Sequence, residues 1–331
     1  MRERDPLSAL SRVLRSIEAV RNTRALAVLL GTFASAGLLV AMAEASLARP
    51  AAGWGPLQAG AALFVAFYGG NAAGILAMDD ARGEAVREIR AALRASLSTA
   101  HRLLLVLAIV FSVYAAAAGA LLGLLWLSRV AVTGAVVGPL LFAVAVPMGV
   151  LAVGLGALSL VAVVVPLAAP GVWSGAGVRS IVTQLVALVR QRLLMVVLLM
   201  ATVSLLTAGM GAIATFVVMT GGRVVAQLGV AVVGVEVPAQ QLMAGLFGYG
   251  LRSLGAAGAP PGSGGHAAAA LVGGGVVFAL ALVLPGLVYL RGTCAVYLAL
   301  TEAPTEAFTE AFSDPATDAF TEPTDANRPS R

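Results

Sequence analysis

The sequence predicts an all-α polytopic membrane protein: six transmembrane helices as three hairpins, each preceded by a cytoplasmic interfacial amphipathic helix. Of the 331 residues, 60% are hydrophobic and 11% are charged, whereas a soluble domain carries about a quarter charged residues. Six apolar stretches reach the roughly 20 residues that a helix needs to cross a bilayer. An arginine-bearing amphipathic segment directly precedes the first, the third and the fifth of these stretches.

The number of spans depends on how the apolar region 130–169 is divided. If this region held two spans, Arg179 and Arg190 would lie on the side of the membrane opposite the other arginine clusters. We therefore interpret 130–139 as an interfacial or re-entrant lead-in that ends at Pro139. The six spans are expected at 25–45, 56–78, 103–127, 140–168, 193–219 and 268–290.

Each amphipathic segment has an apolar stripe at spacings of three and four residues, which is typical of a helix with one apolar face. The stripes are Leu7, Leu10, Leu14 and Ile17; Val86, Ile89, Leu93 and Leu97; and Val178, Ile181, Leu185 and Leu188. Asp79 and Asp80 are interpreted as caps of the second segment. Such helices lie in the headgroup plane with the apolar stripe facing lipid, and three in equivalent places indicate an internal repeat. The candidate contacts to anionic lipid headgroups are Arg12, Arg15, Arg87, Arg90, Arg94, Arg179 and Arg190.

Arginine placement predicts the orientation. All 21 basic residues are arginine. The N-terminal segment holds six of them, 79–102 holds five and 171–192 holds three, whereas the other side has only Arg49, Arg129, Arg223 and Arg252. The positive-inside rule then places both termini in the cytoplasm of a bacterial inner membrane. The arginine-rich first 24 residues lack the cleavage site of a signal peptide.

Two segments differ from this membrane domain, which covers residues 1–300. The tail 301–331 carries seven acids and two arginines, and its repeated Thr-Glu-Ala-Phe theme predicts a disordered cytoplasmic segment. It is either a docking peptide for a protein partner or low-complexity drift. The apolar stretch 224–237 is too short to span, so it is expected to be re-entrant, interfacial or strand-like.

Few polar residues fall within the predicted spans. Asn71 lies in one, flanked by glycines, where its amide either bonds across helices or lines a polar cavity. His101 and His266 fall on opposite predicted sides, and Cys294 is the only cysteine. These residues form no catalytic, cofactor or metal-ligating pattern. The sequence therefore predicts a protein that is not an enzyme, holds no cofactor or metal and binds no nucleic acid.

Residues 170–190 read PGVWSGAGVRSIVTQLVALVR, in which a span ends in proline, a glycine turn follows and an amphipathic helix ends in arginine. This segment resembles six-helix bacterial membrane families such as the membrane domain of glycerophosphoryl diester phosphodiesterases. The resemblance implies their layout of helices. The chain lacks the soluble catalytic domain and the acidic and histidine cluster of those enzymes, so their activity is not carried over.

Two classes of function fit these patterns. The first is a non-enzymatic scaffold or accessory protein at the membrane, favoured by the scarcity of catalytic and ion-coupling residues. The second is a transporter or lipid-handling permease for a small or apolar solute, favoured by the repeat, by prolines within the spans and by Asn71.

Overall fold

The computed structural model describes residues 6–47, 54–129, 134–233 and 264–301, and every regular element in these ranges is helical. Within these ranges, six helices are long and apolar enough to cross a membrane, so the predicted all-α fold with six spans is confirmed. The elements are α1 (Pro6–Leu14), the 3-10 helix η1 (Arg15–Arg21), α2 (Thr23–Leu47), α3 (Trp54–Arg82), α4 (Ile89–Arg129), α5 (Gly134–Ser159), the π-helical turn η3 (Leu160–Val164), α6 (Val165–Trp173), α7 (Val178–Val233) and α10 (Gly264–Thr301).

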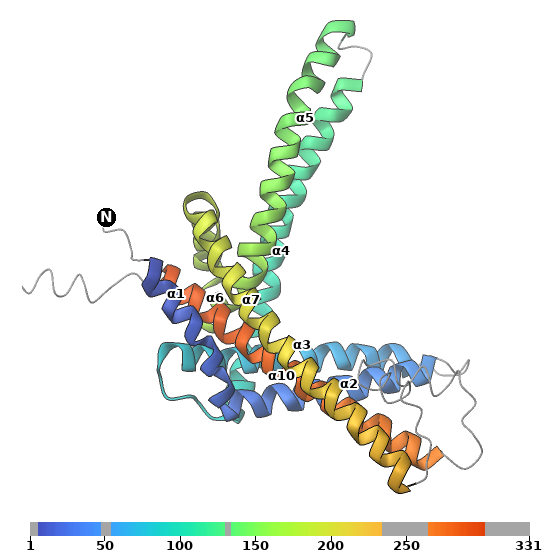
Figure 1. Cartoon of the computed structure of the whole chain (residues 1–331). Coiled ribbons are helices and arrows are strands. Elements are labelled where there is room, and N and C mark those ends of the chain that lie inside the picture. The colour runs from blue at the N-terminus through green and yellow to red at the C-terminus, as the bar shows by residue number, and fades with distance from the viewer. Residues whose placement is uncertain (1–5, 48–53, 130–133, 234–263, 302–331) are drawn as a thin grey trace, which may run out of the picture.

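The six long helices pair as the three hairpins α2/α3, α4/α5 and α7/α10. Figure 1 shows these hairpins diverging from a shared region, with α4/α5 pointing away from the other two. We call this shared region the base. It is formed by α1, η1 and α6, by the ends of α3 and α10, and by the starts of α4 and α7.

Only the second amphipathic segment is continuous with the span that follows it. Residues 89–129 form one helix of 41 residues, because no proline or glycine interrupts the chain between the arginine-rich part and the apolar part. The third segment forms the start of α7 and is set off from its span by a kink at Arg192, where the backbone is non-helical, with φ −137° and ψ 21°. The first segment is also set off from its span, by the non-helical backbone of Asn22.

Two segments predicted to be irregular are parts of long helices where the structure describes them, so their re-entrant and strand-like forms are wrong. Helix α5 begins at Gly134 and contains Pro139 and Pro147, so 134–139 is not a separate lead-in. Each proline removes a single backbone hydrogen bond, which the long ladder around it tolerates. Helix α7 continues through Val224 to Val233, since neither Gly221 nor Gly222 ends it. Residues 130–133, 234–237 and the acidic tail from 302 lie outside the described residues.

The main hydrophobic core lies in the base, where α3, α6, α7 and α10 meet. The third apolar stripe belongs to this core, because Ile181, Leu185 and Leu188 are buried by the protein itself. Leu93 and Leu97 of the second stripe are instead exposed, and small residues of α4, among them Ala92 and Ser96, face the protein. The expectation that all three stripes face lipid is therefore wrong for the third.

The first segment follows the pattern of the second. Leu14 and Ile17 are exposed, whereas Val13, Ser16 and Ala19 are buried against the rest of the base. Their spacing of three residues suits the 3-10 helix η1, in which every third side chain lies on the same face. The Leu-rich faces of the first two segments are thus available to lipid.

A glycine in α3 makes close packing between α3 and α6 possible. A Cβ atom on Gly74 would lie 2.3 Å from ring atoms of Trp173, so we expect Gly74→Ala to destabilise the fold by about 1–3 kcal/mol through overpacking. Thermal unfolding of the purified protein in detergent measures this loss. Gly70→Ala is the matched control, because its Cβ would meet nothing within 4 Å. Equal stability of the two variants would contradict the packing shown here.

Candidate functional site

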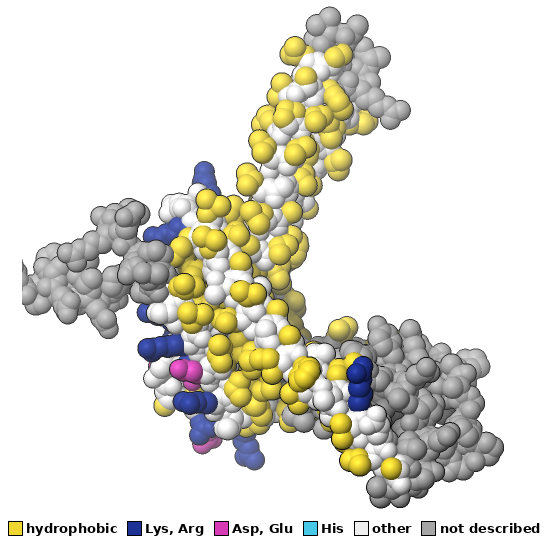
Figure 2. All heavy atoms as spheres, viewed as in Figure 1, with side chains coloured by type: hydrophobic (Ala, Val, Ile, Leu, Met, Phe, Trp, Pro, Cys, Tyr) yellow, Lys and Arg dark blue, Asp and Glu magenta, His cyan; other side chains and the backbone are white. Residues whose placement is uncertain are grey.

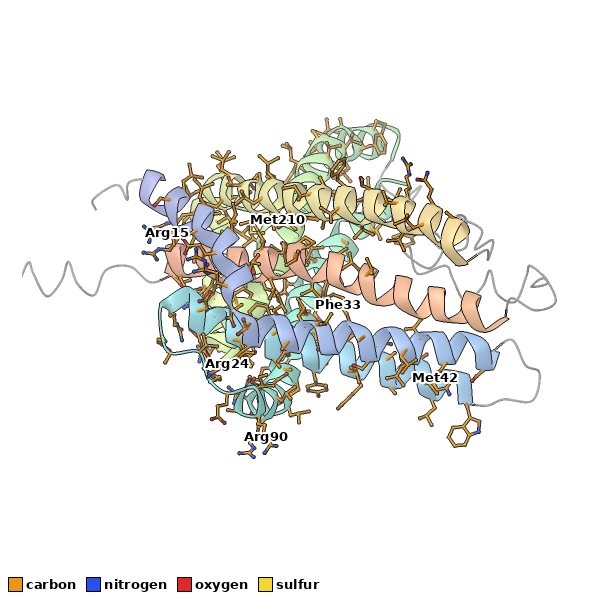
Figure 3. All side chains as sticks on the ribbon, turned by 60° about the horizontal axis from the view of Figure 1, so that its bottom comes forward. Arg15, Arg24, Phe33, Met42, Arg90 and Met210 are labelled. Carbon is orange, nitrogen blue, oxygen red and sulfur yellow. The ribbon has the colours of Figure 1, made fainter. Side chains whose placement is uncertain are left out.

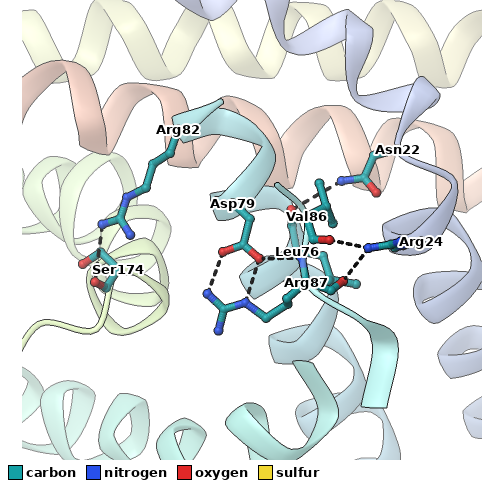
Figure 4. A network of polar contacts seen from close by, with 8 residues as sticks. All are labelled: Asn22, Arg24, Leu76, Asp79, Arg82, Val86, Arg87 and Ser174. Atoms are coloured by element: carbon teal, nitrogen blue, oxygen red, sulfur yellow. Dashed lines mark hydrogen bonds and ion pairs between the residues drawn. The ribbon is translucent and has the colours of Figure 1, made fainter. Parts of the chain in front are cut away.

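The end of α3 carries two adjacent carboxylates that bind different parts of the base. Asp79 is buried and accepts two hydrogen bonds from the Arg87 guanidinium, from Nε and from Nη2, each 2.7 Å long. It also accepts the backbone N–H of Arg87 at 3.3 Å. Figure 4 shows this pair folding the loop between α3 and α4 back onto α3. The side-chain hydrogen bond that Arg87 donates to Asp79 raises the pKa of Arg87, so the guanidinium stays charged.

Asp80 points to α10 instead. Its carboxylate lies 2.9 Å from Nε of Arg291. The same guanidinium donates to the backbone carbonyl of Arg15 at 2.8 Å and lies 3.8 Å from the Glu18 carboxylate. The interpretation of Asp79 and Asp80 as helix caps is corrected, because α3 runs on to Arg82 and α4 begins only at Ile89. Their main partners are arginine side chains from other elements.

The start of α2 is attached to the same loop. The side-chain oxygen of Asn22 accepts the backbone N–H of Ala25 at 3.0 Å and so caps α2. Its amide nitrogen donates to the carbonyl of Leu76 at 3.3 Å. Arg24 donates to the carbonyls of Val86 and Arg87. Sequence reasoning missed Asn22 and Arg24, although an asparagine directly before an apolar run is a recognisable cap signal.

Six of the seven predicted headgroup arginines lie on elements of the base, and Arg87 lies in the loop between α3 and α4. Arg87 directs its guanidinium to Asp79. The other six are Arg12, Arg15, Arg90, Arg94, Arg179 and Arg190, and each is exposed. Figure 2 shows arginine side chains gathered over the base, while the hairpins beyond it are covered mainly by hydrophobic side chains. Contact of these six with lipid stays a prediction.

Asn71 is a residue of α3 and is buried where α3 meets α6. Its amide nitrogen donates to the carbonyl of Phe67 at 2.8 Å, and its oxygen accepts a hydrogen bond from Nε1 of Trp173 at 2.9 Å. Of the two roles left open by the sequence, this geometry corresponds to the bond across helices. Trp173 was not singled out in the sequence, because nothing local to it shows that it meets α3.

Two neighbouring cavities open beside the start of α2. The larger has a volume of about 440 Å³ and is almost entirely apolar. We call it the apolar cavity; it is lined by Ala27, Val28, Gly31, Thr32, Ser35, Phe64, Val65, Tyr68, Gly69, Ile89, Leu93 and Leu97. The smaller, about 240 Å³, is called the polar cavity and is lined by Arg21, Asn22, Thr23, Arg24, Asp80 and Val86. The sequence did not predict either one.

Within the described ranges, no three histidine, cysteine or acidic side chains come together to hold a metal ion. Cys294 is buried in the core of the base. The hydrogen bonds and ion pairs of the base hold the helices in position, and the two cavities lie beside the start of α2. In comparisons with known proteins, the chain matches no family model, no curated protein and no solved structure.

The Asp79–Arg87 pair is asymmetric, because the carboxylate side chain is 3% exposed and the arginine side chain 40%. Arg87→Gln leaves a buried carboxylate without its cation, so we expect a loss of roughly 2–3 kcal/mol of stability. Asp79→Asn leaves only a cation that water can reach, so it should cost less. Adding Asp79→Asn to Arg87→Gln should recover part of the loss.

Unfolding by denaturant in detergent micelles checks the order of these variants. Arg90→Gln is the control, since Arg90 is exposed on the neighbouring helix start and its loss should change stability by less than about 0.5 kcal/mol. A loss for Arg87→Gln no larger than that for Arg90→Gln would refute the proposed asymmetry.

Proposed function

We propose that this chain is a multi-pass protein of a bacterial inner membrane, with its base and both termini on the cytoplasmic side. The support is the concentration of exposed arginines on the base, at one end of the hairpins, because cytoplasmic ends of spans carry the excess of arginine. Anionic headgroups in that leaflet attract such a surface. We extend to this chain the helix layout of the glycerophosphoryl diester phosphodiesterase membrane domain, without that family's activity.

This orientation is tested by labelling single cysteines in intact cells. In a Cys294→Ala background, Arg90→Cys and Arg190→Cys should both be protected from an impermeant thiol reagent, since both lie at the base. Arg223→Cys, in the distal half of α7, should be labelled. Reaction of Arg90→Cys and Arg190→Cys from different sides would overturn the six-span topology.

We further propose that the protein is a non-enzymatic scaffold or accessory protein, with α4/α5 as its docking surface for a transmembrane helix of another membrane protein. The observation that carries this proposal is that only 11% of an 18-residue apolar stretch of α4 is buried inside the protein. Tyr114 and Leu121 of α4 face glycines of α5. Gly119 and Gly123 lie on the opposite side, where a Cβ would meet nothing within 4 Å. Small residues of this kind allow a second helix to approach closely.

Photo-crosslinking in living cells tests this docking surface. A photoreactive residue in place of Ala120 should yield one adduct of defined mass with another membrane protein. The double variant Gly119→Leu and Gly123→Leu should reduce its yield by about tenfold, because large side chains prevent close helix contact.

Gly154→Leu is the matched control, as it adds the same side chain to an open position on α5. Adducts with lipid alone, or a protein adduct that the double variant leaves unchanged, would contradict the docking role. The role of 301–331 as a second docking segment stays a prediction, since all but Thr301 lies outside the described residues.

The alternative function is a transporter or lipid-handling permease for a small or apolar solute. The apolar cavity between α2, α3 and α4 supports it, because apolar ligands bind in concave, mostly apolar sites of this size. Asn71 is not among the residues that line this cavity, and its amide oxygen accepts a hydrogen bond from Trp173. Flux of lipid or an apolar solute in liposomes, abolished by filling the cavity, would favour this alternative.

A further inference from the structure

The apolar cavity has the shape and chemistry of a site for a hydrocarbon chain. On α2 it is lined by the small residues Ala27, Gly31 and Ser35, which repeat every fourth residue and so share one face of the helix. Larger side chains from α3 and α4 complete its walls. The hydroxyl groups of Thr32 and Ser35 donate to carbonyls of their own helix, so they do not require a polar occupant. Figure 3 shows α2 beside α3, with Arg24 of α2 and Arg90 of α4 labelled close to the base.

Residues that line the polar cavity precede residues that line the apolar cavity by about one helical turn, toward the base. Arg24 precedes Ala27 by three residues on α2, and Val86 precedes Ile89 by three residues. On α2 this separation is about 4.5 Å along the helix axis. The hydrogen bonds from Arg24 to the carbonyls of Val86 and Arg87 hold its guanidinium at this place.

The charges around the polar cavity suit an anion. Arg21 and Arg24 are exposed and line it. Asp80, the acidic residue in its wall, is 2.9 Å from Arg291, which offsets its repulsion of an anion. Glu18 on η1 also lies near Arg291, at 3.8 Å.

We infer that the two cavities together bind one anionic phospholipid, with its phosphate at Arg21 and Arg24 and one acyl chain in the apolar cavity. From Arg24 to Ser35 is eleven residues of helix, or about 16 Å, which matches one leaflet of a hydrocarbon core about 30 Å thick. A partner helix, about 10 Å across, does not suit a 440 Å³ cavity. This inference shares with the proposed function only the placement of the base at the membrane surface, and it does not depend on the scaffold role.

The acyl-chain part is tested by filling the cavity. Gly31→Leu places a side chain in it without a backbone clash, because a Cβ there would meet nothing within 4 Å. Gly37→Leu is the matched control, since Gly37 is equally open, on the same helix, and does not line the cavity. Ala27→Leu fills the cavity from the preceding turn and serves as an independent second variant.

The full chain, purified in detergent, is titrated with phosphatidylglycerol, and bound lipid is counted by native mass spectrometry. The unsubstituted chain should retain one lipid. Gly31→Leu and Ala27→Leu should each weaken retention by about tenfold, through lost burial of a few methylene groups, and Gly37→Leu should not. Equal retention by Gly31→Leu and Gly37→Leu would overturn the assignment of the chain site.

The headgroup part is tested with phosphatidylcholine as the zwitterionic comparison. The double variant Arg21→Gln and Arg24→Gln should lower the preference for phosphatidylglycerol by about tenfold, while Arg179→Gln, exposed on α7, should not. Unchanged preference in the double variant, or equal binding of the two lipids by the unsubstituted chain, would overturn the assignment of Arg21 and Arg24 to the phosphate.

Discussion

The buried carboxylate of Asp79 is the constraint around which the base is organised. A charge in a low-dielectric interior is costly unless it is paired and hydrogen-bonded, and Asp79 receives three hydrogen bonds from Arg87 alone. This pairing holds the loop after α3 against α3 and thereby sets where α4 begins. Asp80 forms a second ion pair, with Arg291 of α10. Two adjacent residues thus connect all three hairpins.

The remaining polar contacts of the base follow from the same requirement. Trp173 of α6 donates a hydrogen bond to the side chain of Asn71 on α3. The hydroxyl of Tyr297 donates to the Gln184 side chain at 2.9 Å, which connects α10 to α7. Packing supports these bonds, because Gly74 lets the Trp173 ring approach the α3 backbone. Side-chain hydrogen bonds thus connect the helices of the base, whereas the hairpins beyond it expose mainly apolar side chains.

This division explains why two surfaces are candidates for interaction. The α4/α5 hairpin has few protein neighbours along most of its length, so its outer face is available to a partner helix. The pair of cavities instead lies where the base meets the apolar hairpins, so it combines arginines with a hydrocarbon-lined space. The first surface suits a protein and the second suits an amphiphile, and each follows from its position relative to the base.

Local patterns in the sequence were sufficient for placement in a membrane, for six spans and for their pairing as hairpins, because hydropathy and length alone decide whether a helix can cross a bilayer. Six of the seven predicted headgroup arginines lie on elements of the base, and their contact with lipid stays a prediction. The local patterns were misleading where helices continue through prolines or glycines, as at Pro139 and at Gly221, since a long backbone ladder tolerates such residues.

The sequence could not show which face of an apolar helix meets protein. In a membrane, lipid is as apolar as leucine, so a covered stripe and a lipid-facing stripe have the same composition. Ile181 and Leu185 are buried in the core, while Leu93 and Leu97 are exposed, although both pairs have the same helical spacing. The Asn71–Trp173 bond and the two cavities depend likewise on residues far apart in the chain. Sequence by itself determined that the chain belongs in a membrane and how often it can cross; only the tertiary structure decided which faces meet, because that depends on contacts between distant segments.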